Sequence, residues 1–337
     1  MQTTQPDAHA CVARRTFAAV FLLLSATCAF ATDSLQPLRA QFALPNERID
    51  YTEAKLVVDK LIDPGTDVAA LRKALGQWEA AVRTNVPSGA TTRQTFDALV
   101  KTLYEPGPWN QHKPFAYDLD DPLGTKPETK RLTTYLATRK GNCISMPILV
   151  VILGQRLGLP VALTIAPDHV LVKFFDDTQQ AWLNFEATAG GFKTNASIEH
   201  ELGITAKAIE NELYLRPLTP REGVGLMAST LMEHYGKAGN AEALMTLADL
   251  ALAVNPRDLF AILAKGNAYF VMTQRFVDRY PRVSDIPREQ VADWWHASRE
   301  NLAWFAKAEA LGWEEPTPEQ RAEYLKSIER EKARRKR

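Results

Sequence analysis

This chain of 337 residues contains little cysteine and has no excess of positive or negative charge. It contains three cysteines and six histidines, so few thiols and imidazoles are available for chemistry. The 40 Lys and Arg residues are balanced by 40 Asp and Glu residues, which gives a formal net charge of zero. Because nucleic-acid binding relies on a basic surface, this balance argues against a nucleic-acid partner. With 46% hydrophobic residues, the chain can bury one or two ordinary cores.

A hydrophobic run long enough to span a membrane is also lacking. The most apolar stretch, residues 17–30, follows Arg14-Arg15 and is too short for a spanning helix. Ala29-Phe30-Ala31 supplies a small-x-small cleavage site. We therefore predict a signal peptide over residues 1–31 and an exported, periplasmic protein with no membrane span. The paired arginines leave both general secretion and twin-arginine export open.

Cleavage at that site changes the number of thiols in the mature protein. Cys11 and Cys28 leave with the signal peptide, and Cys143 remains. A single thiol excludes an internal disulfide and a multi-cysteine metal site. Two interpretations of Cys143 stay open at this point: a buried inert residue, or a reactive nucleophile.

Residues 32–128 are predicted to form an N-terminal helical region followed by a long loop. Residues 35–50 have no clear period and suggest an extended lead-in. Helical spacing of apolar residues predicts helices over 51–61, from 66 or 67 to about 86, and 92–104. Residues 105–130 are rich in proline and too long for a plain connection. A packed surface loop is the favoured interpretation there, and a wall of a functional site is the alternative.

Residues 129–197 have the pattern of an α+β core. We expect a helix over 129–138 that breaks at Gly141, and a second helix that begins at Cys143 and ends near Gly158. Three short strands follow, over 160–165, 169–175 and 181–186, and the glycines near residue 190 end the sheet. The fold class is therefore a helix with cysteine at its N-terminus, packed on an antiparallel sheet.

The rest of the chain, residues 198–337, is predicted to be helical. We expect helices over 199–211, 220–235 and 294–311, and a solvated, frayed end in the basic tail at 332–337. The spacing of small residues over 241–269 resembles the tetratricopeptide repeat, and a generic helical hairpin explains it equally well. A region of this kind could bind a protein partner through a groove.

Cys143 occupies a position that favours a thiolate. Gly141 and Asn142 break the preceding helix, so the sulfur would lie in the first turn of the next one. Unpaired N–H groups and the helix dipole stabilise an anion there. The backbone N–H of Cys143 could also donate to a developing oxyanion. Ser145 could support that oxyanion, but capping the helix is its expected role.

His169 and Glu186 are the predicted base and its orienting carboxylate. If residues 176–179 form a four-residue hairpin loop, paired residue numbers sum to 355 and place His169 directly opposite Glu186. A shift of one residue would put Glu186 on the other face of the sheet. Asp168 ranks second as the orienting group, because adjacent strand residues face opposite ways.

Three stretches resemble a known family. Arg139-x-Gly141-x-Cys143, the His169 strand and Trp182-x-x-x-Glu186-x-Thr188 resemble the transglutaminase-like superfamily, and a bacterial branch of it joined to tetratricopeptide-type helices. The resemblance implies a papain-like core with Cys, His and an acidic residue in this order, although Glu186 stands where Asp is usual.

The same resemblance implies acyl chemistry on amides. We expect Cys143, His169 and Glu186 to be catalytic, without a cofactor or metal, on a peptide or protein substrate, cell-wall peptides included. The reaction would be transfer to an amine or hydrolysis. A catalytically inactive binding or scaffold protein with the same core is the alternative.

Overall fold

The computed structural model describes residues 34–335, and the predicted signal peptide lies outside the described residues. The helices are α2 (Gln36–Ala43), α3 (Tyr51–Ile62), α4 (Val68–Asn85), α5 (Thr92–Tyr104), α6 (Leu132–Thr138), α7 (Ser145–Arg156), α8 (Asn195–Leu202), α9 (Ala206–Glu210), α10 (Pro220–Lys237), α11 (Ala241–Val254), α12 (Leu259–Arg279), α13 (Arg288–Leu311) and α14 (Pro318–Arg335). Four short 3-10 helices are η1 (Asn46–Arg48), η2 (Pro108–Asn110), η3 (Pro127–Lys130) and η4 (Val283–Asp285). Among the described residues, no helix has the length and apolar character needed to cross a membrane.

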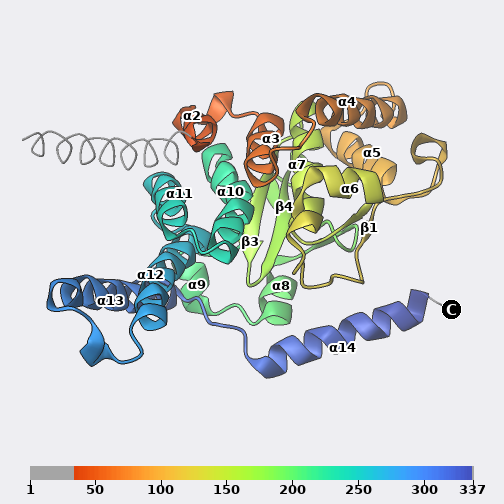
Figure 1. The fold of residues 1–337 in the computed structure, drawn as a ribbon. Helices are drawn as coiled ribbons and strands as arrows, with labels where there is room; N and C mark the ends of the chain where they lie inside the picture. Colours follow the sequence, from red (N-terminus) through yellow and green to blue (C-terminus); the bar gives the residue numbers. More distant parts are fainter. Residues whose placement is uncertain (1–33, 336–337) are drawn as a thin grey trace, which may run out of the picture.

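The described strands form one four-stranded antiparallel sheet and one short parallel pair. The strands are β1 (Ala116–Tyr117), β2 (Lys140–Gly141), β3 (Val161–Ala166), β4 (His169–Asp176), β5 (Ala181–Glu186) and β6 (Gly191–Lys193). The sheet has the order β3-β4-β5-β6, and β1 pairs with β2. Helices α3 to α7 gather around the sheet, and α10 to α13 lie together at one end of the molecule (Figure 1). The α+β expectation is therefore confirmed in its coarse form.

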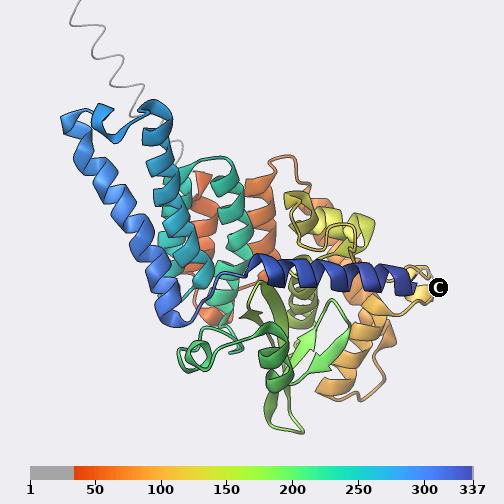
Figure 2. The same cartoon turned by 90° about the horizontal axis from the view of Figure 1, so that it is seen from below.

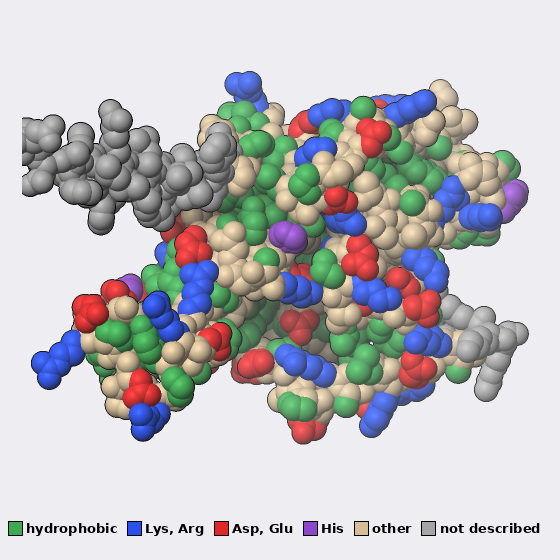
Figure 3. All heavy atoms as spheres, viewed as in Figure 1, with side chains coloured by type: hydrophobic (Ala, Val, Ile, Leu, Met, Phe, Trp, Pro, Cys, Tyr) green, Lys and Arg blue, Asp and Glu red, His purple; other side chains and the backbone are tan. Residues whose placement is uncertain are grey.

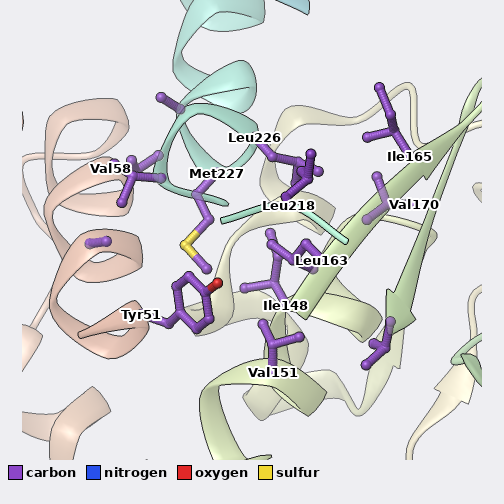
Figure 4. Close-up of a cluster of buried hydrophobic side chains, with 14 of the residues drawn as sticks. Tyr51, Val58, Ile148, Val151, Leu163, Ile165, Val170, Leu218, Leu226 and Met227 are labelled. Carbon is purple, nitrogen blue, oxygen red and sulfur yellow. The ribbon is translucent and has the colours of Figure 1, made fainter. Parts of the chain in front are cut away.

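Helix α7 is the centre of the core because it is apolar on every side. Every residue from Ser145 to Gly154 is buried, as expected for a helix surrounded by other elements. Tyr51 and Val58 of α3, Leu163 of β3 and Met227 of α10 converge with α7 residues in one cluster (Figure 4). The sheet is therefore covered by helices that come from both ends of the chain.

An aromatic contact fastens α5 to the sheet. The ring of Phe96 lies 4.4 Å from that of Phe174 and 5.2 Å from that of Phe185, measured between centroids. Strand β3 lies at the edge of the sheet, and this edge is paired because the N–H groups of Leu215 and Leu218 donate to β3 carbonyls. An unpaired strand edge would otherwise invite pairing with another chain.

Several boundaries differ from those predicted from the sequence. Residues 36–43 form helix α2 rather than an extended lead-in, because Leu38 and Phe42 bury one side of it. The glycines near residue 190 turn the chain into a fourth strand, β6, instead of ending the sheet. The helix predicted over 199–211 is two helices, since Gly203 adopts a left-handed conformation with φ of 63° and ends α8.

The largest difference concerns the end of the chain. Residues 318–335 form α14. The sequence predicted a helical region over 198–337 but gave no separate bounds for a helix here, and it predicted a frayed end from residue 332 onwards. Viewed from below, α14 lies across the face of the molecule that carries the strands (Figure 2). On the face seen in Figure 1, acidic and basic side chains are mixed over the surface (Figure 3). The amphipathic signal is weak because the helix is strongly polar.

Candidate active site

Cys143 lies in the turn that leads into α7, two residues before its first helical residue. Asn142 caps this turn: its side-chain oxygen accepts hydrogen bonds from the N–H groups of Ile144 and Ser145, at 3.0 and 3.1 Å. The Asn142 carbonyl also accepts from the N–H of Met146. The helix was predicted to begin at Cys143 itself. The thiol nevertheless remains at the N-terminal end of α7, where Asn142 accepts from the N–H groups of the first turn.

Ser145 is part of the same cap. Its hydroxyl accepts a hydrogen bond from the N–H of Asn142 at 3.1 Å, and the side chain is fully buried. The capping role is therefore confirmed over a role on an oxyanion. Asn142 is also fully buried, and its amide donates to the hydroxyl of Thr129. The residue before Cys143 is thus held by hydrogen bonds on both sides.

Gly141 allows the close packing that this turn requires. A methyl group in place of its hydrogen would lie 2.5 Å from the ring of Tyr135 and 2.7 Å from Met146. Both neighbours are buried in the core. Any larger residue would push the chain away from α6 and move Cys143 with it.

His169 and Glu186 are in direct contact. The Nε2 atom of His169 lies 2.6 Å from Oε2 of Glu186. The side chain of His169 is 20% exposed and that of Glu186 is 9% exposed. The predicted partnership is therefore present in the structure.

The register that produces this contact differs from the predicted one. Val172 pairs with Phe185 and Asp176 with Ala181, so paired numbers sum to 357 rather than 355. The hairpin loop still has four residues, but it begins one residue later. Glu186 is therefore a diagonal neighbour of His169 on the same face of the sheet. The shift of two residues preserves the face, and the long Glu side chain covers the remaining distance.

Thr188 positions the carboxylate of Glu186. Its backbone N–H and its hydroxyl both donate to Oε1, at 3.0 and 2.6 Å. The two oxygens of Glu186 are thus used separately, one by Thr188 and the other by His169. In the sequence, Thr188 stood out only as part of a motif, although threonine hydroxyls often form hydrogen bonds with groups a few residues away.

The charges of this cluster favour a protonated imidazole. Burial lowers the pKa of His169, but hydrogen bonds and charge from Cys143 and Glu186 outweigh it and raise the pKa to about 10. Burial raises the pKa of Glu186, and contact with His169 and Thr188 brings it below its ordinary value. With Nε2 occupied by Glu186, Nδ1 is the nitrogen left for Cys143. Such an arrangement suits a thiolate–imidazolium pair.

Asp168 contributes its backbone rather than its carboxylate. It occupies the turn between β3 and β4 with φ of 50°, and its carbonyl oxygen lies 3.8 Å from the Cys143 sulfur. The turn places the start of β4 directly beside the thiol. Glu186, and not Asp168, is the carboxylate in hydrogen-bond contact with His169.

The proline-rich loop forms a wall of the site. Strand β1 in this loop pairs with β2 immediately before Cys143, and the N–H of Asp118 donates to the Gly141 carbonyl at 2.7 Å. The guanidinium of Arg139 donates to the carbonyls of Asn110 and Lys113, and therefore fastens the loop instead of pointing to solvent. The alternative of a site wall was correct because these hydrogen bonds join segments far apart in the sequence.

A cavity of about 440 Å³ adjoins the His169–Glu186 pair. Its lining includes Tyr117 and Leu119 of the loop, Leu171 of β4, and Ile198 and Leu202 of α8. Tyr324 and Ile328 of α14 complete the lining. A larger hollow of about 610 Å³ beside β5 and β6 includes none of Cys143, His169 and Glu186 and is not the candidate site.

Within residues 34–335, no group of three or more His, Cys, Asp or Glu side chains could hold a metal ion. The nearby carboxylate of Asp121 accepts hydrogen bonds from Thr125 and Thr129, and that of Asp120 pairs with Lys140. These acidic side chains therefore organise the loop.

Comparison with known proteins identifies one family. The profile of the transglutaminase-like superfamily matches residues 69–228, from α4 through the Cys143 turn and the sheet to α10. No curated protein and no solved structure matches the sequence. The match extends well beyond the stretch that carried the resemblance and includes helices on both sides of it. Residues 69–228 are a transglutaminase-like superfamily domain.

Proposed function

We propose that the protein is an exported, cysteine-dependent acyl-transfer enzyme that acts on amide or peptide bonds. The observation that carries the proposal is the contact between His169 and Glu186 at 2.6 Å, with Cys143 as the neighbour of the same imidazole. A thiol beside a base that is itself oriented by a third group is the arrangement expected for nucleophilic catalysis.

The reaction would proceed through a covalent thioester. The Cys143 thiolate attacks the amide carbonyl, and a backbone N–H at the start of α7 stabilises the negative charge on the oxygen. The C–N bond breaks as His169 donates its proton to the leaving amine. Water or a second amine then attacks the thioester and His169 accepts its proton. The C–S bond breaks, which restores the Cys143 thiolate beside the imidazolium. Glu186 stabilises the imidazolium and holds its orientation.

An activated acyl donor tests the proposal without knowledge of the natural substrate. p-Nitrophenyl acetate should acetylate Cys143, and mass spectrometry of the peptide that contains Cys143 measures the rate. His169→Ala should slow acetylation by about 10²-fold or more, the lower end of what a general base contributes. Exposed His200 supplies the matched control, His200→Ala, which should acetylate at the native rate. Equal rates for His169→Ala and the native protein would refute the enzyme proposal.

The fate of the acetyl group distinguishes transfer from hydrolysis. Adding cadaverine after acetylation should produce N-acetylcadaverine if an amine is the preferred acceptor. Release of acetate at an unchanged rate would identify a hydrolase. In either case, the rate at which Cys143 loses its acetyl group should depend on His169.

A binding or scaffold function is the second candidate. The helical region supports it, because four large apolar side chains of α12 and α13 are about half exposed or more: Phe270, Val277, Trp295 and Leu302. Helices α10 to α13 would then present a partner-binding surface of the tetratricopeptide type. A protein with only this function would show no His169-dependent acetylation of Cys143.

Export is part of the same proposal. Its support is the apolar stretch after Arg14-Arg15 and the cleavage site that follows it. Expression of the full chain in a Gram-negative host, followed by N-terminal sequencing of the periplasmic fraction, tests it. A mature N-terminus at Thr32 is expected, and an uncleaved protein that stays in the cytoplasm would contradict export.

A further inference from the structure

Helix α14 covers the side of the candidate site that a substrate would approach. Tyr324 and Ile328 are one helical turn apart, and both line the cavity that His169 and Glu186 line. Figure 2 shows the helix, in dark blue, crossing this face from one side of the domain to the other. An element from the end of the chain thus lies over residues in its middle.

Tyr324 and Ile328 hold α14 in place. The hydroxyls of Tyr324 and Tyr117 lie 2.6 Å apart, and both are within hydrogen-bonding distance of the Pro122 carbonyl. Ile328 is buried, with 7% of its surface exposed. Tyr324 lines the same cavity as His169 and Glu186. Burial raises the pKa of Tyr324, and the negative charges of Cys143 and Glu186 add to the rise.

Helix α14 as a whole is weakly attached to the domain. Leu325, on the same helix, is 41% exposed, and Tyr324 itself is 39% exposed. Residues 313–317, which contain Pro316, connect α14 to α13 without regular structure. A polar helix whose described side chains are mostly exposed opens at low free-energy cost compared with core helices.

Long-range charges add to this attachment. Burial raises the pKa of Asp168, next to His169, and the positive charge of Arg321 on α14 opposes the rise. The charge of Lys332 likewise helps to lower the pKa of Asp120, after the stronger effect of Lys140. Interactions between exposed charges are screened by salt, so they guide the helix into place without locking it.

We infer that α14 is an autoinhibitory strap that closes the cavity beside His169 and Glu186 and must be displaced before an acyl donor can enter. Removing Tyr324 and Ile328 from the cavity would leave Leu119, Leu171, Ile198 and Leu202 as its apolar walls. Such a groove suits an aliphatic or aromatic side chain of a peptide. The inference concerns regulation of the site and rests on the proposed function, but closure itself can be measured without catalysis.

Accessibility of Cys143 to a bulky reagent tests the strap in the full chain. Ile328→Asp places a charge in the cavity and should release α14, whereas Leu325→Asp introduces the same charge at an exposed position. At pH 8.5, Ile328→Asp should react with a 5-kDa polyethylene-glycol maleimide at Cys143 at least about tenfold faster than the native protein, because labelling follows the open fraction. Leu325→Asp should react at the native rate. Native-rate labelling of Ile328→Asp would overturn the inference.

Two further measurements separate opening from misfolding and from failure of the proposed function. Hydrogen exchange of the native protein should show α14 amides exchanging faster than those of α7 by at least about 10²-fold. Equal protection of the two helices would also overturn the inference. Maleimide labelling needs only an accessible thiol, so a strap could be demonstrated even where His169→Ala leaves p-nitrophenyl acetate reactivity unchanged. The circular dichroism of Ile328→Asp should match that of Leu325→Asp.

Discussion

His169 and Glu186 meet through their side chains although the β4–β5 ladder does not place them opposite each other. Their contact at 2.6 Å spans two positions of the ladder, and Thr188 holds the second oxygen of the carboxylate. The length of the Glu186 side chain is essential to this geometry, because two diagonal residues of a ladder lie farther apart than two directly opposed residues.

Shortening or neutralising Glu186 should therefore weaken the site in different ways. Glu186→Gln keeps the length of the side chain but removes the charge that stabilises the imidazolium. We expect alkylation of Cys143 by iodoacetamide at pH 6 to slow by about tenfold or more, equivalent to about 1.4 kcal/mol of lost ion-pair stabilisation.

Glu186→Asp keeps the charge but not the reach, and should slow alkylation at pH 6 to a similar extent. Thr188→Val, which loses only the hydroxyl bond to Oε1, should have a smaller effect. Alkylation at the native rate in both Glu186 variants would show that the carboxylate does not support the imidazole.

The pKa of His169 predicts a pH-dependent stability. Because the folded-state pKa is raised from 6.5 to about 10, the imidazolium stabilises the fold fully below pH 6.5. This contribution is lost as pH rises from 6.5 towards 10, at a slope of up to about 1.4 kcal/mol per pH unit. The difference in free energy of unfolding between the native protein and His169→Ala should therefore shrink over this range. Urea unfolding at pH 6.5, 8 and 9.5 measures it, and His200→Ala should show a constant difference.

Removing the cap before Cys143 should destabilise the protein and displace the thiol. Asn142→Ala deletes the acceptor for two N–H groups and leaves the buried Thr129 hydroxyl without this partner. We expect a loss of about 2 kcal/mol in the free energy of unfolding, as for a buried N-cap. Asn142→Asp keeps the acceptor oxygen and should lose less. Chemical denaturation compares the two, and a stability of Asn142→Ala equal to the native value would contradict the capping role.

A methyl group at Gly141 should cost stability through overpacking. The added atom would meet Tyr135 and Met146 at 2.5 and 2.7 Å, and neither can move freely in the core. Gly141→Ala should lower the free energy of unfolding by about 1–3 kcal/mol. Gly191→Ala is the control, because an added methyl at Gly191 meets no atom within 4 Å. Equal stability of the two variants would show that the Cys143 turn tolerates displacement.

Much of the secondary structure followed from local patterns. Helices α3, α4 and α5 begin and end within a residue or two of the predicted limits, since apolar period, capping residues and prolines act over a few residues. Strands β3, β4 and β5 were predicted from alternation and from the turn residues between them. Helix α2 was missed because it is short, and its two buried apolar residues show a helical face only once the elements that cover them are known.

The sequence by itself determined which three groups were candidates and the order in which they occur. The expected hairpin also put His169 and Glu186 on one face of the sheet, and they share it because the observed register differs by two positions and side-chain direction alternates at every residue of a strand. Tertiary structure decided the register, the closing of the proline-rich loop over Cys143, and the position of α14 across the cavity. The positions of the loop and of α14 depend on contacts between residues far apart in the sequence, such as Tyr117 with Tyr324, 207 positions apart, and no local pattern encodes which distant partner a side chain will meet.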